Sequence, residues 1–182
     1  MSTRHLGPVH TTGRALAARH RPRGFTLIEA VIAMGVIALL MSLALPSFND
    51  MVARARLRAA AEDLAIGLGN ARLESLRPGA GTQHVSVQPG SPWCWAVGSA
   101  PQPDCRGNAP GSYKVVHGED YPGVVMSGGL SAVFDGSQQI AGITLAATFV
   151  SAQGQTLRVH MTPLGRASIC ALDVRIADYP LC

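Results

Sequence analysis

The feature that most limits how this chain can fold is an apolar run from Phe25 to Leu45, in which Glu29 is the only charged side chain. A helix over these residues is about 30 Å long, which matches the thickness of the hydrocarbon core of a bilayer. With 182 residues in total, no soluble domain of this chain could surround an apolar helix of that length. The run therefore predicts a transmembrane helix at 25–45, in contact with membrane lipid.

A cleaved secretory signal peptide is the alternative for this run. The run is longer than a typical signal-peptide core, contains an acid near its start, and is not followed by a small-x-small cleavage site. Arg21 and Arg23 directly precede the run, whereas the first basic residue after it is Arg54. The first three features predict that the span is retained. The positive-inside rule predicts that its N-terminus is in the cytoplasm and the rest of the chain is outside.

The positive charge of the chain is concentrated in its first 24 residues. These hold five Arg and no acid, so the remaining ten basic residues face all 11 acidic ones and the formal charge beyond residue 24 is −1. That balance disfavours a globally basic nucleic-acid-binding protein. The apolar content of 47% also excludes a disordered tail.

Glu29 needs an explanation, because a carboxylate within a bilayer costs at least a few kcal/mol unless it has a partner. It could reach back to the membrane interface. The segment Arg23–Glu29, RGFTLIE, also resembles the N-terminal signal of type IV pilins and type II secretion pseudopilins. The resemblance implies that prepilin peptidase cuts after Gly24, that residues 1–24 are a leader, and that Phe25 becomes the methylated N-terminus. It also implies an assembly role for Glu29, whose carboxylate would pair with the α-amine of a neighbouring subunit.

The sequence after the span predicts an amphipathic helix at 46–77. Apolar residues recur there at helical spacing, and the stripe needs a partner surface to cover it. Pro46 should disrupt the helix locally, Asn49 or Asp50 could cap a restart, and Pro78-Gly79 should end it. The stripe consists of Leu57, Ala61, Leu64, Leu68 and Ala71.

The remaining residues, 78–182, predict a β-rich domain, because short runs of β-branched and apolar residues alternate with Gly- and Pro-containing turns. Six of the 12 prolines fall in 78–112, which favours a long irregular connection there. The turn signals are Pro89-Gly90, Asp135-Gly136, Gln153-Gly154 and Pro163-Leu164-Gly165. The expected strands are 84–87, 113–116, 124–126, 143–150, 156–161 and 167–172.

Four cysteines follow the span, and three pairings are possible. Sequence proximity favours disulfides Cys94–Cys105 and Cys170–Cys182, each worth about 3 kcal/mol by the chain-entropy model. A zinc site is disfavoured, because the chain has no C-x₂-C motif and no nearby pair of His. The tryptophans that flank Cys94, Trp93 and Trp95, could pack against a disulfide or form an exposed stacking platform.

No catalytic motif is present, so we expect neither an enzyme nor a cofactor or metal site. His160 alternates with Val159 and Met161, which predicts a strand residue on the solvent side. Asp135-Gly136 is better explained as a turn. The polar residues that could act as acids, bases or ligands are His84, His117, His160, Glu119, Asp120 and Asp135.

Beyond the signal, residues 23–79 resemble the GspH/FimT/FimU family of minor pilins and minor pseudopilins. The resemblance implies an α+β pilin-like fold, in which a long N-terminal helix packs on an antiparallel β-sheet domain. It implies an inner-membrane protein with a periplasmic C-terminal domain, which assembles with other minor and major pilins or pseudopilins at or near a filament tip. Pro46 and the ALPSF context favour the type IV pilus over the type II secretion system.

Some members of that family bind DNA through a Gly-Arg-x-Arg motif. Here Gly165 and Arg166 match its first two positions, whereas Ser168 replaces the second Arg. Arg158 or Arg175 could assist if the fold brought them near, and a lost phosphate contact would weaken salt-dependent binding. The resemblance therefore leaves a DNA receptor as a third alternative.

Overall fold

The computed structural model describes residues 24–107, 111–136, 140–162, 165–173, 176 and 178–182. Contacts divide the chain into two compact units, Met1–Met41 and Ser42–Cys182. One helix, α1 (Leu27–Ser75), has residues in both units. Each unit is described by itself below.

The described part of the first unit is helical from Leu27 onward. The hydroxyl of Thr26 accepts a hydrogen bond from the Glu29 N–H at 3.3 Å, which caps the helix N-terminus. The apolar side chains that follow are exposed in the isolated chain. By length and composition α1 can cross a membrane, as the apolar run predicts.

α1 continues through Pro46 without a break, so the predicted local disruption is wrong. Proline removes the single hydrogen bond that its own N–H would donate. The bonds of the flanking turns suffice to hold the helix, and neither Asn49 nor Asp50 starts a new one.

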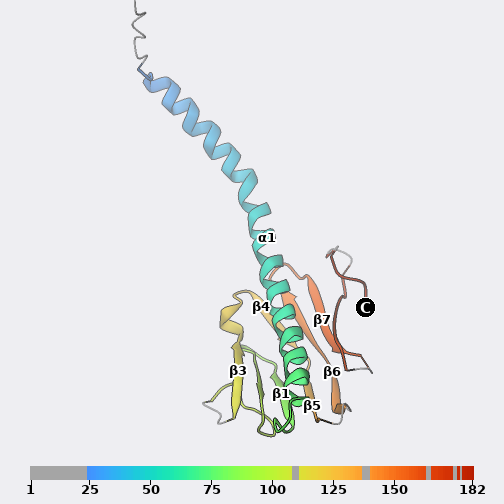
Figure 1. Ribbon diagram of the computed structural model, residues 1–182. Coiled ribbons are helices and arrows are strands. Elements are labelled where there is room, and N and C mark those ends of the chain that lie inside the picture. The colour runs from blue at the N-terminus through green and yellow to red at the C-terminus, as the bar shows by residue number, and fades with distance from the viewer. Residues whose placement is uncertain (1–23, 108–110, 137–139, 163–164, 174–175, 177) are drawn as a thin grey trace, which may run out of the picture. The chain divides into compact units, whose positions relative to one another are not determined.

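In the second unit, α1 packs one face on the sheet (Figure 1). All five residues of the predicted stripe are fully buried, which confirms the amphipathic pattern. Ala60 lies in the same buried face. The helix ends at Ser75, close to the Pro78-Gly79 signal.

The sheet is antiparallel throughout its described pairings, with strand order β3-β2-β1-β5-β6-β7-β8 and with β4 paired to β6. The long strand β6 therefore joins the first part of the sheet to β7 and β8. This arrangement confirms the predicted α+β class. The strands are β1 (Gln83–Gln88), β2 (Cys94–Gly98), β3 (Ser112–His117), β4 (Val124–Ser127), β5 (Leu130–Phe134), β6 (Ile140–Ser151), β7 (Thr156–Met161) and β8 (Ala167–Ala171).

All six expected strands are present, but β2 and β5 were not predicted. β2 is buried along its whole length, so it lacks the alternation that marks a half-exposed strand. The expectation of an irregular connection over 78–112 is wrong, because this stretch contains both β1 and β2. Its prolines lie outside the two strands, where no ladder hydrogen bond is lost.

The core lies between α1 and the facing side of the sheet. Gly67 of α1 contacts Trp95 of β2, and Gly118 contacts Trp93 just before β2. The Trp93 ring also meets the ring of Phe149 edge-on, with 5.5 Å between the centroids. The core is therefore built from small residues on one element that admit large rings from another.

Candidate functional site

Gly24 and Phe25 lie immediately before α1 and are exposed. Phe25 keeps 81% of its surface accessible. A Cβ at Gly24 would meet nothing within 4 Å, so the fold itself does not require glycine there. The peptide bond between Gly24 and Phe25 is thus accessible to a protease, and any need for glycine would come from the enzyme.

Glu29 lies in the first turn of α1 and is exposed. A carboxylate at this end of a helix is favoured by the helix dipole. No cation contacts it within the described part of the chain. Its carboxylate is available to a partner from outside the subunit.

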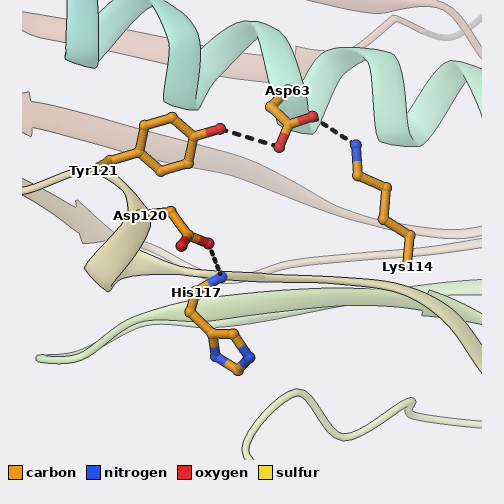
Figure 2. A network of polar contacts seen from close by, with 5 residues as sticks. All are labelled: Asp63, Lys114, His117, Asp120 and Tyr121. Carbon is orange, nitrogen blue, oxygen red and sulfur yellow. Dashed lines mark hydrogen bonds and ion pairs between the residues drawn. The ribbon is translucent and has the colours of Figure 1, made fainter.

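A polar network joins α1 to the sheet (Figure 2). The Lys114 Nζ lies 2.5 Å from one carboxylate oxygen of Asp63, and the Tyr121 hydroxyl donates to the other at 3.1 Å. The ammonium group also lies 5.0 Å from the centroid of the Trp95 ring. Burial, together with the negative charge of Asp63, raises the pKa of Tyr121 to about 12. No sequence pattern predicts this network, because Lys114 and Tyr121 are 51 and 58 residues from Asp63.

The position of Tyr121 depends on a short turn. A 3-10 helix, η1 (Gly118–Asp120), follows β3, and the Asp120 carboxylate accepts the N–H of His117 at 3.3 Å. The Tyr121 N–H then donates to the Gly118 carbonyl at 3.1 Å. Asp120 and His117 thus have a structural role (Figure 2).

The C-terminal segment also contacts α1, through Asp178 and Tyr179. The Tyr179 hydroxyl donates to Glu62 at 2.5 Å, and Asp178 forms an ion pair with Arg58. The Arg58 guanidinium also lies 5.9 Å from the Tyr179 ring centroid. Burial, followed by the hydrogen bond to Glu62, raises the pKa of Tyr179 to about 12.

The structure contains the disulfides Cys94–Cys105 and Cys170–Cys182, the pairs that sequence proximity favours. The second one attaches the chain end to β8. There the Ala171 N–H also donates to the Pro180 carbonyl, and the Cys182 N–H donates to the Ala171 carbonyl. The C-terminus is therefore bound to the sheet by covalent and hydrogen bonds together.

Trp93 and Trp95 are both buried, which excludes the exposed stacking platform. The packing against the disulfide is not observed either. Cys94 and Cys105 form a small separate cluster with Ala96, whereas both indoles belong to the core beneath α1. Successive residues of a strand point to opposite faces, so Cys94 faces away from its two neighbours.

The residues of the expected DNA contact lie at the turn before β8. Gly165 is buried with a φ of 74°, and its carbonyl accepts a hydrogen bond from Arg72 at 3.0 Å. Arg166 is exposed. Arg158 pairs across the sheet with Cys170, four residues from Arg166 along β8, so the two arginines are about 13 Å apart in that direction. Arg175 lies outside the described residues.

The other polar candidates are scattered. His84 lines a surface cavity on β1, and His117 is exposed at the end of β3. The Nδ1 of His160 lies 3.6 Å from the Cys170 Sγ, on the side of β7 away from the core. Glu119 is in η1, and Asp135 follows β5. No group of three or more metal-ligating side chains occurs among the residues that the structure describes.

The comparison with protein families gives one match, the prokaryotic N-terminal methylation motif, over residues 19–45. The comparisons with curated proteins and with solved structures return no match. The matched segment includes Gly24, Phe25 and Glu29 and ends with the apolar run. This motif is typical of a structural subunit that is processed by prepilin peptidase and anchored in the inner membrane. Together with the helix-on-sheet fold, it supports a type IV pilin-like protein.

Proposed function

We propose that this chain is a minor pilin of a type IV pilus, which prepilin peptidase cleaves between Gly24 and Phe25 and which enters the filament at or near its tip. The N-terminal methylation motif over residues 19–45 carries the proposal. The pilus assignment, rather than a secretion pseudopilus, rests on the sequence context of Pro46.

The geometry of the signal supports this chemistry. The Gly24–Phe25 bond is exposed and precedes the helix, so the peptidase can reach it without unfolding α1. Cleavage leaves an α-amine that is largely cationic near neutral pH. Glu29 follows one turn later and is exposed, so the Glu29 of one subunit can pair with the amine of the next. That pairing would offset the desolvation of both groups.

Processing is tested by Gly24→Ala in the source organism, followed by intact-mass analysis. We expect the variant to retain the leader, whereas the wild type loses residues 1–24 and gains one methyl group on Phe25. Gly35→Ala is the matched control, because a Cβ at either glycine meets nothing within 4 Å. Normal maturation of Gly24→Ala would contradict the cleavage site.

Assembly is tested by Glu29→Gln, which keeps the size of the side chain and removes its charge. We expect normal cleavage but a loss of the subunit from sheared filaments. Glu119→Gln is the control, since it removes an exposed carboxylate from the globular part. Wild-type incorporation of Glu29→Gln would show that this carboxylate has no assembly role.

A minor pseudopilin of a type II secretion system has the same motif and fold. A clean deletion separates the two functions. Normal release of secreted enzymes together with lost piliation is the expected result. A collapse of secretion with intact pili would assign the chain to the pseudopilus instead.

A further inference from the structure

A surface cavity of about 420 Å³ lies where the end of α1 meets the sheet, entirely within the unit Ser42–Cys182. Its volume falls in the range of about 300–1,000 Å³ that is typical of ligand pockets. We call it the Glu74 site. Its described lining is Glu74 of α1, Ala80 before β1, Gln83 at the start of β1, Ser99 after β2 and Tyr113 of β3.

Gln83 brings a buried hydrogen-bond acceptor to this site. Its side chain is only 3% exposed, and its Nε2 donates to the Ala80 carbonyl at 3.0 Å. That bond fixes which end of the amide is the oxygen. The Oε1 has no hydrogen-bond partner among the residues that the structure describes. A buried acceptor without a donor is costly, so this oxygen favours a donor that a ligand supplies.

The other polar groups of the Glu74 site are acceptors as well. Glu74 lies in the last turn of α1, where the helix dipole presents its negative end and favours a cation. The hydroxyls of Ser99 and Tyr113 can also accept hydrogen bonds. No basic residue belongs to the described lining. The site is therefore suited to a cation that carries several N–H donors.

An irregularity of the sheet brings Tyr113 to the site. Val97 of β2 pairs with Lys114 and Gly98 pairs with Ser112, so Tyr113 is an extra residue of β3 without a partner on β2. Such a bulge changes the direction of a side chain. Burial, and after it the negative charge of Glu74, raises the pKa of Tyr113. The phenol and the carboxylate thus lie close enough to act on one ligand.

Glu74 has one internal cation, Arg77, at 3.1 Å. The Arg77 side chain is 73% exposed, and an ion pair of this kind contributes little. A carboxylate also has two oxygens and can accept more than one donor. The pair therefore leaves Glu74 able to bind a second cation.

We propose that the Glu74 site binds the guanidinium group of an arginine side chain that a partner protein presents. A guanidinium has five N–H donors in one plane, enough for the Glu74 carboxylate and the Gln83 Oε1 together, and it stacks on aromatic rings such as that of Tyr113. Free arginine fits less well, because the described lining has no basic group to hold its α-carboxylate. The inference does not depend on which filament the subunit enters.

The test uses the full chain in an uncharged detergent, titrated with the blocked tripeptide acetyl-Ala-Arg-Ala-amide and followed by NMR of the Gln83 side-chain amide. Two comparison peptides replace the arginine by citrulline, which has the same shape without the charge, or by lysine. We expect the citrulline peptide to bind at least tenfold more weakly and the lysine peptide at least threefold more weakly. The arginine peptide should shift the Gln83 amide signals.

Two variants should change the affinity for the arginine peptide in opposite directions. Glu74→Gln removes the charge of the site and should weaken binding at least fivefold. Arg77→Gln removes the internal competitor and should strengthen binding at least twofold. Glu119→Gln and Arg106→Gln are the matched controls, because each changes the net charge by the same amount at an exposed position outside the site and should leave binding unchanged. Since Arg77 is exposed, its variant keeps the test decisive if Glu74→Gln perturbs the fold.

Four results would overturn the proposal. They are equal binding of the arginine peptide and either comparison peptide, unmoved Gln83 amide signals at saturation, and no effect of either variant of the site. The fourth is tighter binding of free arginine than of the blocked peptide, since the site would then take a small molecule and not a side chain of a partner.

Discussion

Trp95 lies so close to Gly67 of α1 that a Cβ on this glycine would be 2.7 Å from two atoms of the indole ring. Real Cβ atoms essentially never approach another atom so closely. The indole is fully buried in the hydrophobic core, so a shift of the ring would have to displace its neighbours. Glycine is costly inside a helix, and its presence at residue 67 is explained by this ring.

Gly67→Ala should therefore destabilise the protein, although alanine is the better helix former. Overpacking a filled core costs about 1–3 kcal/mol, which outweighs a gain in helix propensity of up to about 1 kcal/mol. We expect a net loss of about 1–2 kcal/mol in the free energy of unfolding. Urea titration of the mature chain in detergent, followed by tryptophan fluorescence, measures it.

Gly69 provides the control for this prediction. It is in the same helix, two residues away, but it is exposed and a Cβ there meets nothing within 4 Å. Gly69→Ala should be neutral or stabilise the protein by up to about 1 kcal/mol. Equal effects of the two substitutions would show that the contact with Trp95 is not the reason for Gly67.

The ion pair of Asp63 and Lys114 should contribute more than an ordinary surface pair. Both side chains are about one-third exposed or less, and the carboxylate also accepts the Tyr121 hydroxyl. A double-mutant cycle with Asp63→Asn and Lys114→Met should give a coupling energy of about 1–2 kcal/mol. The same cycle on Glu74 and Arg77, whose arginine is 73% exposed, should give about 0.5 kcal/mol or less. A coupling of Asp63 with Lys114 no larger than this would refute a special role for the network.

The sequence was most informative where a pattern is local. The stripe from Leu57 to Ala71 predicted the buried face of α1, because helical spacing alone places these residues on one side. β2 was missed because burial on both faces removes the alternation that marks a strand.

Contacts between distant segments could not be predicted in the same way. Asp63 and Tyr179 are polar residues of ordinary appearance, and only the fold decides that they meet Lys114 and Glu62. The residues of the N-terminal methylation motif differ in this respect, because the sequence alone identifies them. Gly24, Phe25 and Glu29 function through other proteins, so the sequence motif says more about them than the subunit's own contacts do.

The tyrosines should ionise unusually late. Burial and the nearby carboxylates of Asp63 and Glu62 raise the pKa values of Tyr121 and Tyr179 to about 12, and burial also raises that of Tyr113. An unfolded tyrosine titrates near 10. The stabilisation from these groups is therefore fully present below about pH 10 and is lost as the pH rises toward 12.

Near-ultraviolet absorbance of the phenolate measures this directly. We expect two of the three tyrosines to titrate near 12 in the folded chain, and all three near 10 after unfolding. Glu62→Gln should lower the midpoint of Tyr179 and leave that of Tyr121 unchanged, and Asp63→Asn should do the reverse. Midpoints near 10 in the folded wild type would contradict the two hydrogen bonds.

The disulfide Cys170–Cys182 should control whether the C-terminal segment stays on α1. Replacing both cysteines by serine removes a crosslink over 12 residues, worth about 3 kcal/mol by the chain-entropy model. The contacts of Asp178 and Tyr179 with α1 are partly exposed, and exposed pairs contribute about 1 kcal/mol or less each. We therefore expect the freed segment to leave the helix for a measurable fraction of the time. Faster hydrogen exchange at the amide of Ala171, which donates to Pro180, and a lower titration midpoint for Tyr179 would report its release.

The same double substitution at Cys94 and Cys105 spans a similar 11 residues and should change neither quantity, because that disulfide belongs to a separate cluster on the other face of β2. An unchanged Ala171 amide in the first variant would show that hydrogen bonds and packing hold the segment without the crosslink.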